Sequence, residues 1–340
     1  MMIRLTACTV FLAFLFTAVS TVSAQKHTLI FDSDTNNEVD DQHALAYLLF
    51  NGNHFDVEGV TVNATSSPEG GFVESDIQDH YDEAMRVMKL CGRSDRKIPL
   101  YKGANGSFEE IEGNLALPDF DGHEAVDFII ERALLERKQK LILLAVGKLT
   151  NVALAVKKEP AIASNVRIVW LGSNYPEPGE HNQMWDVGAM NYLLDVEVPF
   201  EMVTVRYDKP SGTTAVRVTL AQIQHRMPGM GPDIAEPVTG RNGGEFVNWG
   251  DYSVNLFEAY QMYGDPEGRS LFDMAAVAIL INPEWAERRE IPAPTYVDDR
   301  WVERPDNDRT IVIREWFDIY GIMNDFFKTM RDPVLVRGDR

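Results

Sequence analysis

The chain has 340 residues, of which 45% are hydrophobic, and this composition is typical of a globular protein with a sizeable core. It carries 52 acidic and 32 basic residues, which gives a formal net charge of −20. A surface of this sign repels phosphate backbones, so we expect no nucleic-acid partner.

Residues 1–24 have the pattern of a secretory signal peptide. Arg4 is their only charged residue, an apolar run follows at 9–19, and small residues end the segment. This pattern predicts cleavage before Gln25 and export to the periplasm or the medium. The apolar run is too short to span a bilayer comfortably, and Cys8 precedes the run, whereas a lipid-modified cysteine would follow it. We therefore expect no stable membrane anchor.

The remaining residues, 25–340, read as a single domain because they contain no internal repeat, low-complexity tract or clear linker. Their net charge is −21, since removal of the signal peptide leaves 31 basic against 52 acidic residues. Cys91 is then the only cysteine, so no internal disulfide can form.

Strands and helices alternate along the mature chain. We expect strands at 27–31, 57–62, 98–101, 140–146, 166–171 and 200–205, and helices at 41–50, 77–90, 125–137, 151–158, 186–194 and 270–282. Apolar strands separated by helices predict an α/β fold with a mostly parallel, Rossmann-like central sheet and helices on both faces. Residues 206–250 are irregular and rich in Gly, Pro and Met, which predicts a mobile loop or a helical insert over the carboxyl-terminal edge of the sheet. Residues 291–316 predict two or three antiparallel strands that form a small C-terminal hairpin, and residues 319–330 predict a final helix.

Polar side chains follow several of the predicted strands directly. Asp32 and Asp34 come after the first strand, Asn63 after the second, and Asn174 after the strand at 166–171. In open parallel sheets, ligands bind beyond the carboxyl ends of the strands. We therefore expect these polar groups to share one rim, where the ligand site lies.

The segment DSDTNNEVDD, residues 32–41, places four aspartates within ten residues. Packed carboxylates repel one another and raise one another's pKa unless a cation neutralises them. The simpler alternative is an acidic turn in which Asp40 or Asp41 caps the following helix. An EF-hand loop starting at Asp32 does not fit, because Asn37 and His43 stand where that loop needs Gly and Glu.

A phosphatase of the haloacid-dehalogenase type is another alternative for this segment. Such enzymes also place an Asp-x-Asp pair after a strand, and Asp32 would then be the nucleophile and Asp34 the acid. The usual Thr two residues later is replaced here by Asn36, and no matching lysine motif follows a later strand.

Five short segments occur in an order that one enzyme family shows. They are Asp32, Asp34, Asp40 and Asp41 after the first strand, AVGKLTNVALAV at 145–156, Ser173-Asn174, Glu180-His181-Asn182 with Asp186 beyond, and Phe272-Asp273 at the start of an apolar helix that leads to Pro283. Together they resemble the inosine-uridine nucleoside hydrolase family over residues 29–283. Two features depart from the family pattern. Residues 35–39 replace a three-residue Pro-Gly-x link, and Phe272 stands where many members have His.

The resemblance implies hydrolysis of the N-glycosidic bond of a ribonucleoside or a related ribosyl compound. It also implies a Ca²⁺ ion held by Asp34, Asp41, Asp273 and the backbone carbonyl of Val146. Asp34 would act as the general base on a water molecule that the ion holds.

Five residues would bind the sugar hydroxyls by the same resemblance: Asp40, Asn63, Asn174, Glu180 and Asn182. Asn182 would also stabilise the positive charge that develops near the ring oxygen, which makes it catalytic as well. The family further suggests a homodimer or a homotetramer.

Two questions stay open at this point. A periplasmic sugar- or nucleoside-binding protein could keep the same fold and metal without turnover. The group that assists the leaving base is unassigned, because Phe272 cannot donate a proton. The candidates are four histidines, His43, His80, His181 and His225, or stacking by Tyr207, Tyr252, Tyr260, Trp185 or Trp249.

Overall fold

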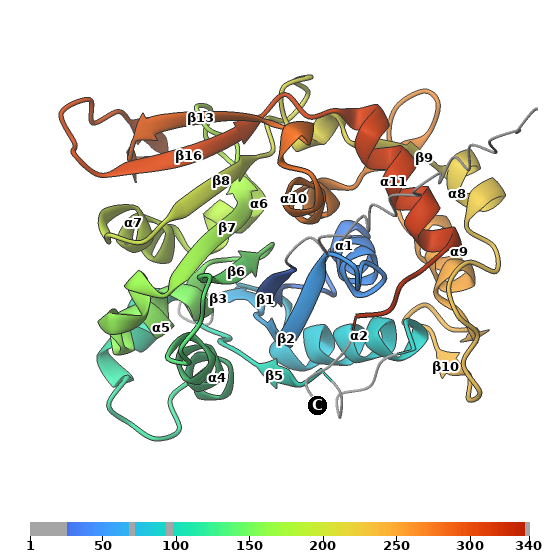
Figure 1. The fold of residues 1–340 in the computed structure, drawn as a ribbon, viewed down its shortest axis with the longest axis horizontal. Helices are drawn as coiled ribbons and strands as arrows, with labels where there is room; N and C mark the ends of the chain where they lie inside the picture. Colours follow the sequence, from blue (N-terminus) through green and yellow to red (C-terminus); the bar gives the residue numbers. More distant parts are fainter. Residues whose placement is uncertain (1–25, 68–71, 93–97, 337–340) are drawn as a thin grey trace, which may run out of the picture.

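The computed structural model describes residues 26–67, 72–92 and 98–336. The expected signal peptide, residues 1–24, lies outside the described residues. An eight-stranded sheet runs through the middle of the molecule in the order β13-β16-β8-β7-β6-β1-β2-β5 (Figure 1). All neighbouring strands are parallel except β13 and β16, which are antiparallel.

The strands of the central sheet are short and mostly buried. Their bounds are β1 His27–Ser33, β2 Phe55–Val62, β5 Leu100–Lys102, β6 Leu141–Ala145, β7 Val166–Ser173, β8 Phe200–Thr204, β13 Glu287–Pro292 and β16 Thr310–Glu315. Four two-stranded ribbons surround it: β3 Thr65–Ser67 with β4 Phe72–Ser75, β9 Arg217–Thr219 with β12 Gly268–Ser270, β10 Val238–Thr239 with β11 Glu245–Phe246, and β14 Thr295–Val297 with β15 Arg300–Val302.

Helices cover both faces of the central sheet, which confirms the predicted α/β fold. Their bounds are α1 Asp40–Leu49, α2 Ile77–Leu90, α3 Phe108–Ile111, α4 His123–Ala133, α5 Thr150–Lys158, α6 His181–Trp185, α7 Val187–Asp195, α8 Leu220–Arg226, α9 Trp249–Ala259, α10 Phe272–Ile281 and α11 Ile319–Arg331. Short 3₁₀ helices lie at Glu112–Asn114, Pro160–Ser164, Thr213–Ala215 and Pro283–Trp285.

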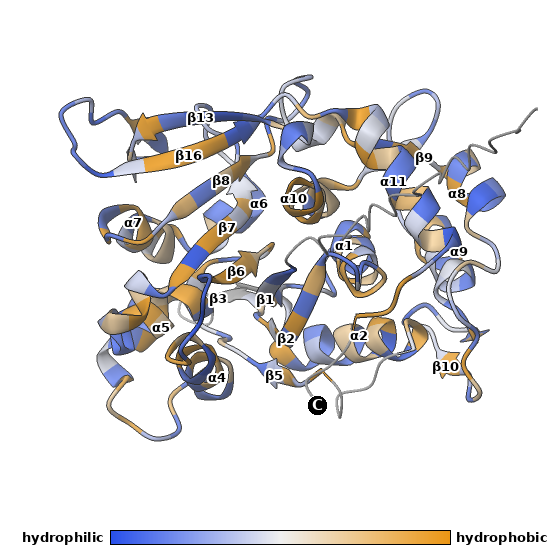
Figure 2. Cartoon of the chain, viewed as in Figure 1, coloured by the Kyte–Doolittle hydropathy of each residue, from blue (hydrophilic) through white to orange (hydrophobic). Residues whose placement is uncertain are grey.

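The core consists of two apolar clusters that share the central sheet. Leu29 and Phe31 of β1 pack into the cluster with α1, α2 and α10, whereas Ile30 between them packs into the cluster with α4, α5 and α7. Alternate residues of a strand point to opposite faces, so a strand covered on both sides has to be apolar throughout. Figure 2 shows the same pattern, with β6 and α10 hydrophobic and the edge strand β13 largely hydrophilic.

Most predicted elements are present, with small shifts at their ends. The helix predicted at 77–90 is α2, while the one predicted at 125–137 is α4 and ends at Ala133. Ser270, predicted as helical, belongs to β12, and α10 begins at Phe272. Helix α8 lies within residues 206–250, for which a helical insert was one of the two predicted alternatives, and α9 begins at the end of this region.

The predicted C-terminal hairpin is formed by β13 and β16. It joins the central sheet, because β16 pairs in parallel with β8. Helix α11 follows and packs near α1 (Figure 1). Among the described residues, no helix combines the length and apolarity that crossing a membrane requires.

Candidate functional site

A cavity of about 600 Å³ opens at the carboxyl ends of four adjacent parallel strands. Asp34 follows β1, Val146 follows β6 and Val205 follows β8, while Leu171 lies near the end of β7. This is the rim at which the sequence predicted the ligand site, and it arises because parallel strands deliver their carboxyl ends to one edge.

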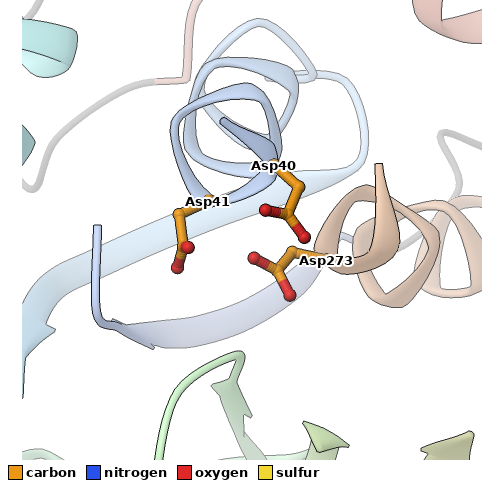
Figure 3. Close-up of side chains that lie close together, drawn as sticks. All are labelled: Asp40, Asp41 and Asp273. Carbon is orange, nitrogen blue, oxygen red and sulfur yellow. The ribbon is translucent and has the colours of Figure 1, made fainter. Parts of the chain in front are cut away.

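Three buried aspartates meet at the floor of this cavity (Figure 3). Asp40 and Asp41 begin α1, Asp273 lies in the first turn of α10, and these two helices pack against each other. One carboxylate oxygen from each lies within 4.8 Å of the others. Burial, followed by repulsion between the carboxylates, raises the pKa of all three groups.

Asp34 adds a fourth carboxylate beside this cluster. Both of its oxygens are buried, and neither has a hydrogen-bond partner among the described residues. Burial, with repulsion from Asp40, raises its pKa to about 8. A buried carboxylate without partners is unfavourable unless a cation or a proton compensates it.

The donor set at this cluster suits a hard divalent cation. It offers several carboxylate oxygens, and Val146 lines the same cavity. The Val146 carbonyl oxygen accepts a hydrogen bond of 2.8 Å from Nδ2 of Asn182. Asp41 is oriented by the Ser33 hydroxyl, which donates to its Oδ1 at 2.8 Å. The residues predicted as ligands are thus close together, and Asp40 lies among them.

Asp32 has a different environment from Asp34. Its Oδ2 accepts hydrogen bonds from Thr61 at 2.6 Å and from Asn151 at 2.7 Å, and its Oδ1 accepts one from Asn63 at 2.7 Å. It does not line the cavity. Burial raises its pKa to about 6, and the three hydrogen bonds oppose this rise. Asp32 therefore acts as a fixed acceptor that ties β1 to β2 and α5.

Asn63 lies behind the cavity wall, next to Asp34. Its Nδ2 is used by Asp32, while its Oδ1 is buried without a partner among the described residues. A Cβ atom built on Gly147 would lie 2.9 Å from Oδ1 of Asn63 and 2.9 Å from Oδ1 of Asp34. Gly147 is therefore needed for these two side chains to approach the loop after β6.

Glu180 and Asn182 both line the cavity at the start of α6. Glu180 is the N-cap of this helix and accepts a hydrogen bond from the Gln183 backbone at 2.9 Å. Burial raises its pKa to about 7. Nδ2 of Asn182 also donates to the Leu171 carbonyl at 3.1 Å, in addition to Val146. Both predicted sugar-binding residues thus lie at the start of α6 and line the cavity that contains the aspartate cluster.

Asn174, like Asn63, is a predicted sugar-binding residue whose side chain is engaged away from the cavity. Its Nδ2 donates to the Pro178 carbonyl at 2.9 Å, and its Oδ1 accepts a hydrogen bond from the Tyr207 backbone at 2.9 Å. It does not line the cavity, whereas Tyr207 does. Asn174 therefore fixes the loop after β8, in which Arg206 and Asp208 adopt positive φ values of 47° and 57°.

Of the four candidate histidines, His181 lines the cavity. Its Nε2 lies 3.9 Å from Oδ2 of Asp34 and contacts Nδ2 of Asn37 at 2.9 Å and Nε1 of Trp185 at 3.0 Å. An indole N–H can only donate, so Nε2 of His181 accepts. His43 and His80 are buried in the core, where burial lowers the pKa of each to about 4.

The aromatic lining consists of Tyr207, Phe272 and Tyr263. The rings of Tyr207 and Phe272 meet edge to face, with centroids 6.0 Å apart. Two aromatic residues considered from the sequence, Tyr252 and Trp249, are fully buried and do not line the cavity. The aromatic wall of the cavity is therefore built from Phe272, Tyr263 and the loop after β8.

One charged pair in this wall was not predicted from the sequence. Arg269 in β12 forms a close ion pair with Glu38, and both residues line the cavity. Glu38 lies in residues 35–39, the lengthened part of the acidic loop. The two partners are 231 residues apart, so no local pattern could have revealed the pair.

Comparison with known proteins agrees with this geometry. Residues 29–315 match the family model described as inosine-uridine preferring nucleoside hydrolase. The inosine-uridine preferring nucleoside hydrolase of Leishmania major is 24% identical over 259 residues, which cover 69% of this chain and 78% of that protein. The pyrimidine-specific ribonucleoside hydrolase RihB of Escherichia coli is 24% identical over 227 residues, which cover 60% of this chain and 66% of that protein.

The fold agrees as well. A solved plant nucleoside hydrolase superposes with a TM-score of 0.67 at 18% identity, covering 91% of this chain and 100% of that one. The match of a family model to most of the chain confirms the resemblance predicted from the five motifs. The chain therefore belongs to the inosine-uridine preferring nucleoside hydrolase family, and it is an enzyme that hydrolyses N-glycosidic bonds.

Proposed function

We propose that this enzyme cleaves ribonucleosides in a calcium-dependent reaction in which Asp34 is the general base. The observation that carries the proposal is the state of Asp34, whose two buried oxygens have no hydrogen-bond partner among the described residues and lie beside three further buried carboxylates. Such an arrangement is unfavourable in isolation and becomes favourable when a cation and a water molecule occupy it.

Asp34, Asp41, Asp273 and the Val146 carbonyl are the proposed ligands, and Asp40 is close enough to share in this role. Their hard oxygen atoms suit Ca²⁺, which accepts six to eight oxygen ligands. Bound Ca²⁺ would supply the positive charge that orients a water molecule and lowers its pKa.

The protein side chains then divide the work of hydrolysis. Asp34 removes a proton from water as the oxygen attacks the anomeric carbon. Glu180 and Asn182, which line the same cavity, would hold the sugar, and the oxygen of the Asn182 amide would stabilise positive charge in the ring. Asp40 accepts a hydrogen bond from a sugar hydroxyl. Asn63 lies close to Asp34 at Gly147, and Asn174 would act through the Tyr207 loop.

The phosphatase alternative is not favoured by the surroundings of Asp32. That mechanism needs Asp32 as a nucleophile that reaches the substrate. Asp32 instead accepts three hydrogen bonds and does not line the cavity. The binding-protein alternative keeps the same site without turnover; the match to the hydrolase family does not favour it, and an activity measurement tests it directly.

The test is release of free base from a panel of purine and pyrimidine ribonucleosides. We expect turnover by the wild-type protein that disappears with a chelator and returns with Ca²⁺. Asp34→Asn should lower kcat by a factor of about 10² to 10⁴, the usual contribution of a general base. Asp299→Asn, an exposed turn residue outside the cavity, is the matched control and should retain full activity.

Ribose-induced thermal stabilisation without any base release would support the binding protein and contradict the proposal. Phosphate release with Mg²⁺ would support the phosphatase.

We also propose that the enzyme is exported, with the mature chain beginning at Gln25. The basis is the charge and apolarity pattern of residues 1–24. N-terminal sequencing of the protein recovered from the periplasm or medium of an expressing host tests this, and recovery of the uncleaved chain in the cytoplasm would contradict it.

A further inference from the structure

The cavity contains a buried cation as well as its acidic floor. Arg269 lies at the middle of β12, paired with Val218 of β9, and only four residues before Asp273. It is 5% exposed and lines the cavity. A guanidinium this buried needs compensating contacts, and the structure supplies them from several directions.

Four groups hold the Arg269 guanidinium in place. Glu38 forms the ion pair, the Gln261 carbonyl accepts a hydrogen bond of 3.2 Å, and the rings of Tyr260 and Tyr263 each lie 4.9 Å from the guanidinium carbon. The carboxylate and the carbonyl each take a hydrogen from a different terminal nitrogen, and every terminal nitrogen of a guanidinium carries two. Arg269 is therefore rigidly held and still retains donor capacity.

Glu38 links this cation to the segment that carries Asp34, Asp40 and Asp41. It lies between Asp34 and Asp40, within the residues that lengthen the acidic loop. The loop is fixed beside it, because Nδ2 of Asn37 contacts His181 at 2.9 Å and the Tyr260 hydroxyl donates to the Asn37 carbonyl at 3.2 Å. The longer loop thus carries the carboxylate that aligns Arg269.

The other two cations of the lining are less well placed. Arg217 donates to the backbone carbonyls of Tyr263 and Pro266, and no carboxylate orients it among the described residues. Lys209 is exposed. Of these three lining residues, Arg269 is the one that combines burial, a carboxylate partner and aromatic rings on its flanks.

We propose that Arg269 receives the departing base. Its N–H groups would donate to a ring nitrogen or exocyclic oxygen of the base and stabilise the negative charge that accumulates there as the bond breaks. The proposal rests on the proposed hydrolysis of ribonucleosides. It assigns to Arg269 the stabilisation of the leaving base, which Phe272 cannot provide because its side chain has no hydrogen-bond donor. Glu38 is then a positioning residue, because it acts by aligning Arg269.

The bond changes balance without an additional acid in the active site. The water oxygen forms a bond to the anomeric carbon, and its proton passes to Asp34. The bond from the anomeric carbon to the base nitrogen breaks, and its electron pair goes to the base. The base leaves as an anion held by Arg269 and takes a proton from solvent after release, while Asp34 returns its proton to solvent.

The experiment compares two substrates that differ in how much help the leaving group needs. One is a nucleoside that the wild-type enzyme cleaves. The other is 4-nitrophenyl β-D-ribofuranoside, whose nitrophenolate is a stable anion. Arg269→Gln should lower kcat on the nucleoside by a factor of about 10² to 10³, as loss of one preorganised charge-stabilising donor does, and leave hydrolysis of the nitrophenyl riboside nearly unchanged.

Three further variants complete the comparison. Glu38→Gln should lower nucleoside turnover selectively but less than Arg269→Gln, because the guanidinium remains while its alignment weakens. Arg269→Lys keeps the charge but loses the planar guanidinium, so its nucleoside turnover should lie between those of Glu38→Gln and Arg269→Gln. Arg288→Gln breaks an exposed ion pair with Glu290 on β13 and should leave both substrates unaffected.

The possible failures are distinguishable. A wild-type protein that cleaves neither substrate contradicts the proposed function itself. A wild-type protein that cleaves both, with Arg269→Gln losing both to the same extent, overturns the role of Arg269 and leaves the proposed function intact. If the melting curve shows that Arg269→Gln does not fold, Arg269→Lys and Glu38→Gln take its place. Loss of nucleoside turnover alone in these variants supports the role of Arg269, and equal loss on both substrates overturns it.

Discussion

Asp32 and Asp34 are two residues apart in the acidic segment 32–41, yet their carboxylates have opposite surroundings. Asp32 accepts three hydrogen bonds from Thr61, Asn63 and Asn151, whereas Asp34 accepts none among the described residues. The strand places Asp32 among the side chains of its neighbours, and the chain then turns so that Asp34 faces the cavity. The first carboxylate is structural, and the second is available for chemistry.

This difference predicts opposite effects of two equivalent substitutions on the stability of the calcium-free protein. Asp34→Asn should raise the melting temperature near neutral pH, because it removes a buried carboxylate that has no hydrogen-bond partner among the described residues. Asp32→Asn should lower it by an amount equivalent to about 1–3 kcal/mol, because an amide nitrogen would face one of the three donors. Thermal unfolding in the presence of a chelator measures both.

The control for this comparison is Asp299→Asn, at an exposed turn, which should leave the melting temperature unchanged. Equal destabilisation by both loop substitutions would show that Asp34 has stabilising partners without the ion, which contradicts the argument.

The raised pKa of Asp34 predicts how calcium stabilisation depends on pH. Burial raises this pKa from 3.8 to about 8 in the folded protein, and Glu180, with a pKa of about 7, shifts in the same direction. Between about pH 4 and pH 8, Asp34 and Glu180 of the folded calcium-free protein therefore hold protons that the unfolded chain has already released. Its stability from these groups is fully present below pH 4 and falls as the pH rises towards 8.

Calcium replaces those protons, so its effect should grow with pH. We expect a larger calcium-induced rise in melting temperature at about pH 8 than at about pH 5. Asp34→Asn should reduce the difference between the two conditions. A calcium effect that is equal at both pH values would contradict the assignment of Asp34 as a ligand.

Much of the fold could be predicted from the sequence because its signals are local. The apolar strands and amphipathic helices follow a period that neighbouring residues define, and α2 was predicted with its observed bounds. The strand ends meet at one cavity for the same reason, since parallel strands share an edge, but of the four polar residues predicted there Asp34 alone lines that cavity. Asp34, Asp41 and Asp273 were found through their short motifs.

The unpredicted features depend on contacts between distant segments. Arg269 belongs to no recognisable motif, and its place in the cavity depends on an ion pair with Glu38, which is distant in the sequence. Asn174 ends a strand as Asn63 does, but the loop after β8 takes up its side chain through the Tyr207 backbone. Neither outcome is encoded by spacing or composition near the residue concerned.

The amide of Asn182 predicts a third effect, because its Nδ2 donates to two backbone carbonyls, Val146 at 2.8 Å and Leu171 at 3.1 Å. Asn182→Asp places a carboxyl group against two acceptors. The introduced group should favour its protonated form, so the variant should lose stability as the pH rises through the raised pKa. Melting temperatures across a pH series measure this, with exposed Asn114→Asp as the control. A variant as stable as the wild type at high pH would show that the amide has another orientation.

Gly147 carries the most direct test of how the site is packed. A Cβ atom at this position would lie 2.9 Å from Oδ1 of Asp34, a separation that real Cβ contacts essentially never show. Gly147→Ala should therefore displace Asp34 or the loop that carries Val146, and kcat should fall by about 10²-fold while the fold survives, because small misplacements of reacting groups have effects of this size.

Gly113→Ala is the matched control, since a Cβ atom at that position would meet nothing within 4 Å among the described residues and the φ of Gly113 is ordinary. Gly113→Ala should retain both wild-type turnover and wild-type calcium affinity. Gly147→Ala should lose affinity for calcium along with turnover, because two proposed ligands, Asp34 and Val146, adjoin the added methyl group. Full activity in Gly147→Ala would mean that Asp34 can move without consequence. The close approach of the loop after β6 would then be a packing feature, and the general base would have to be sought among the other carboxylates of the cavity.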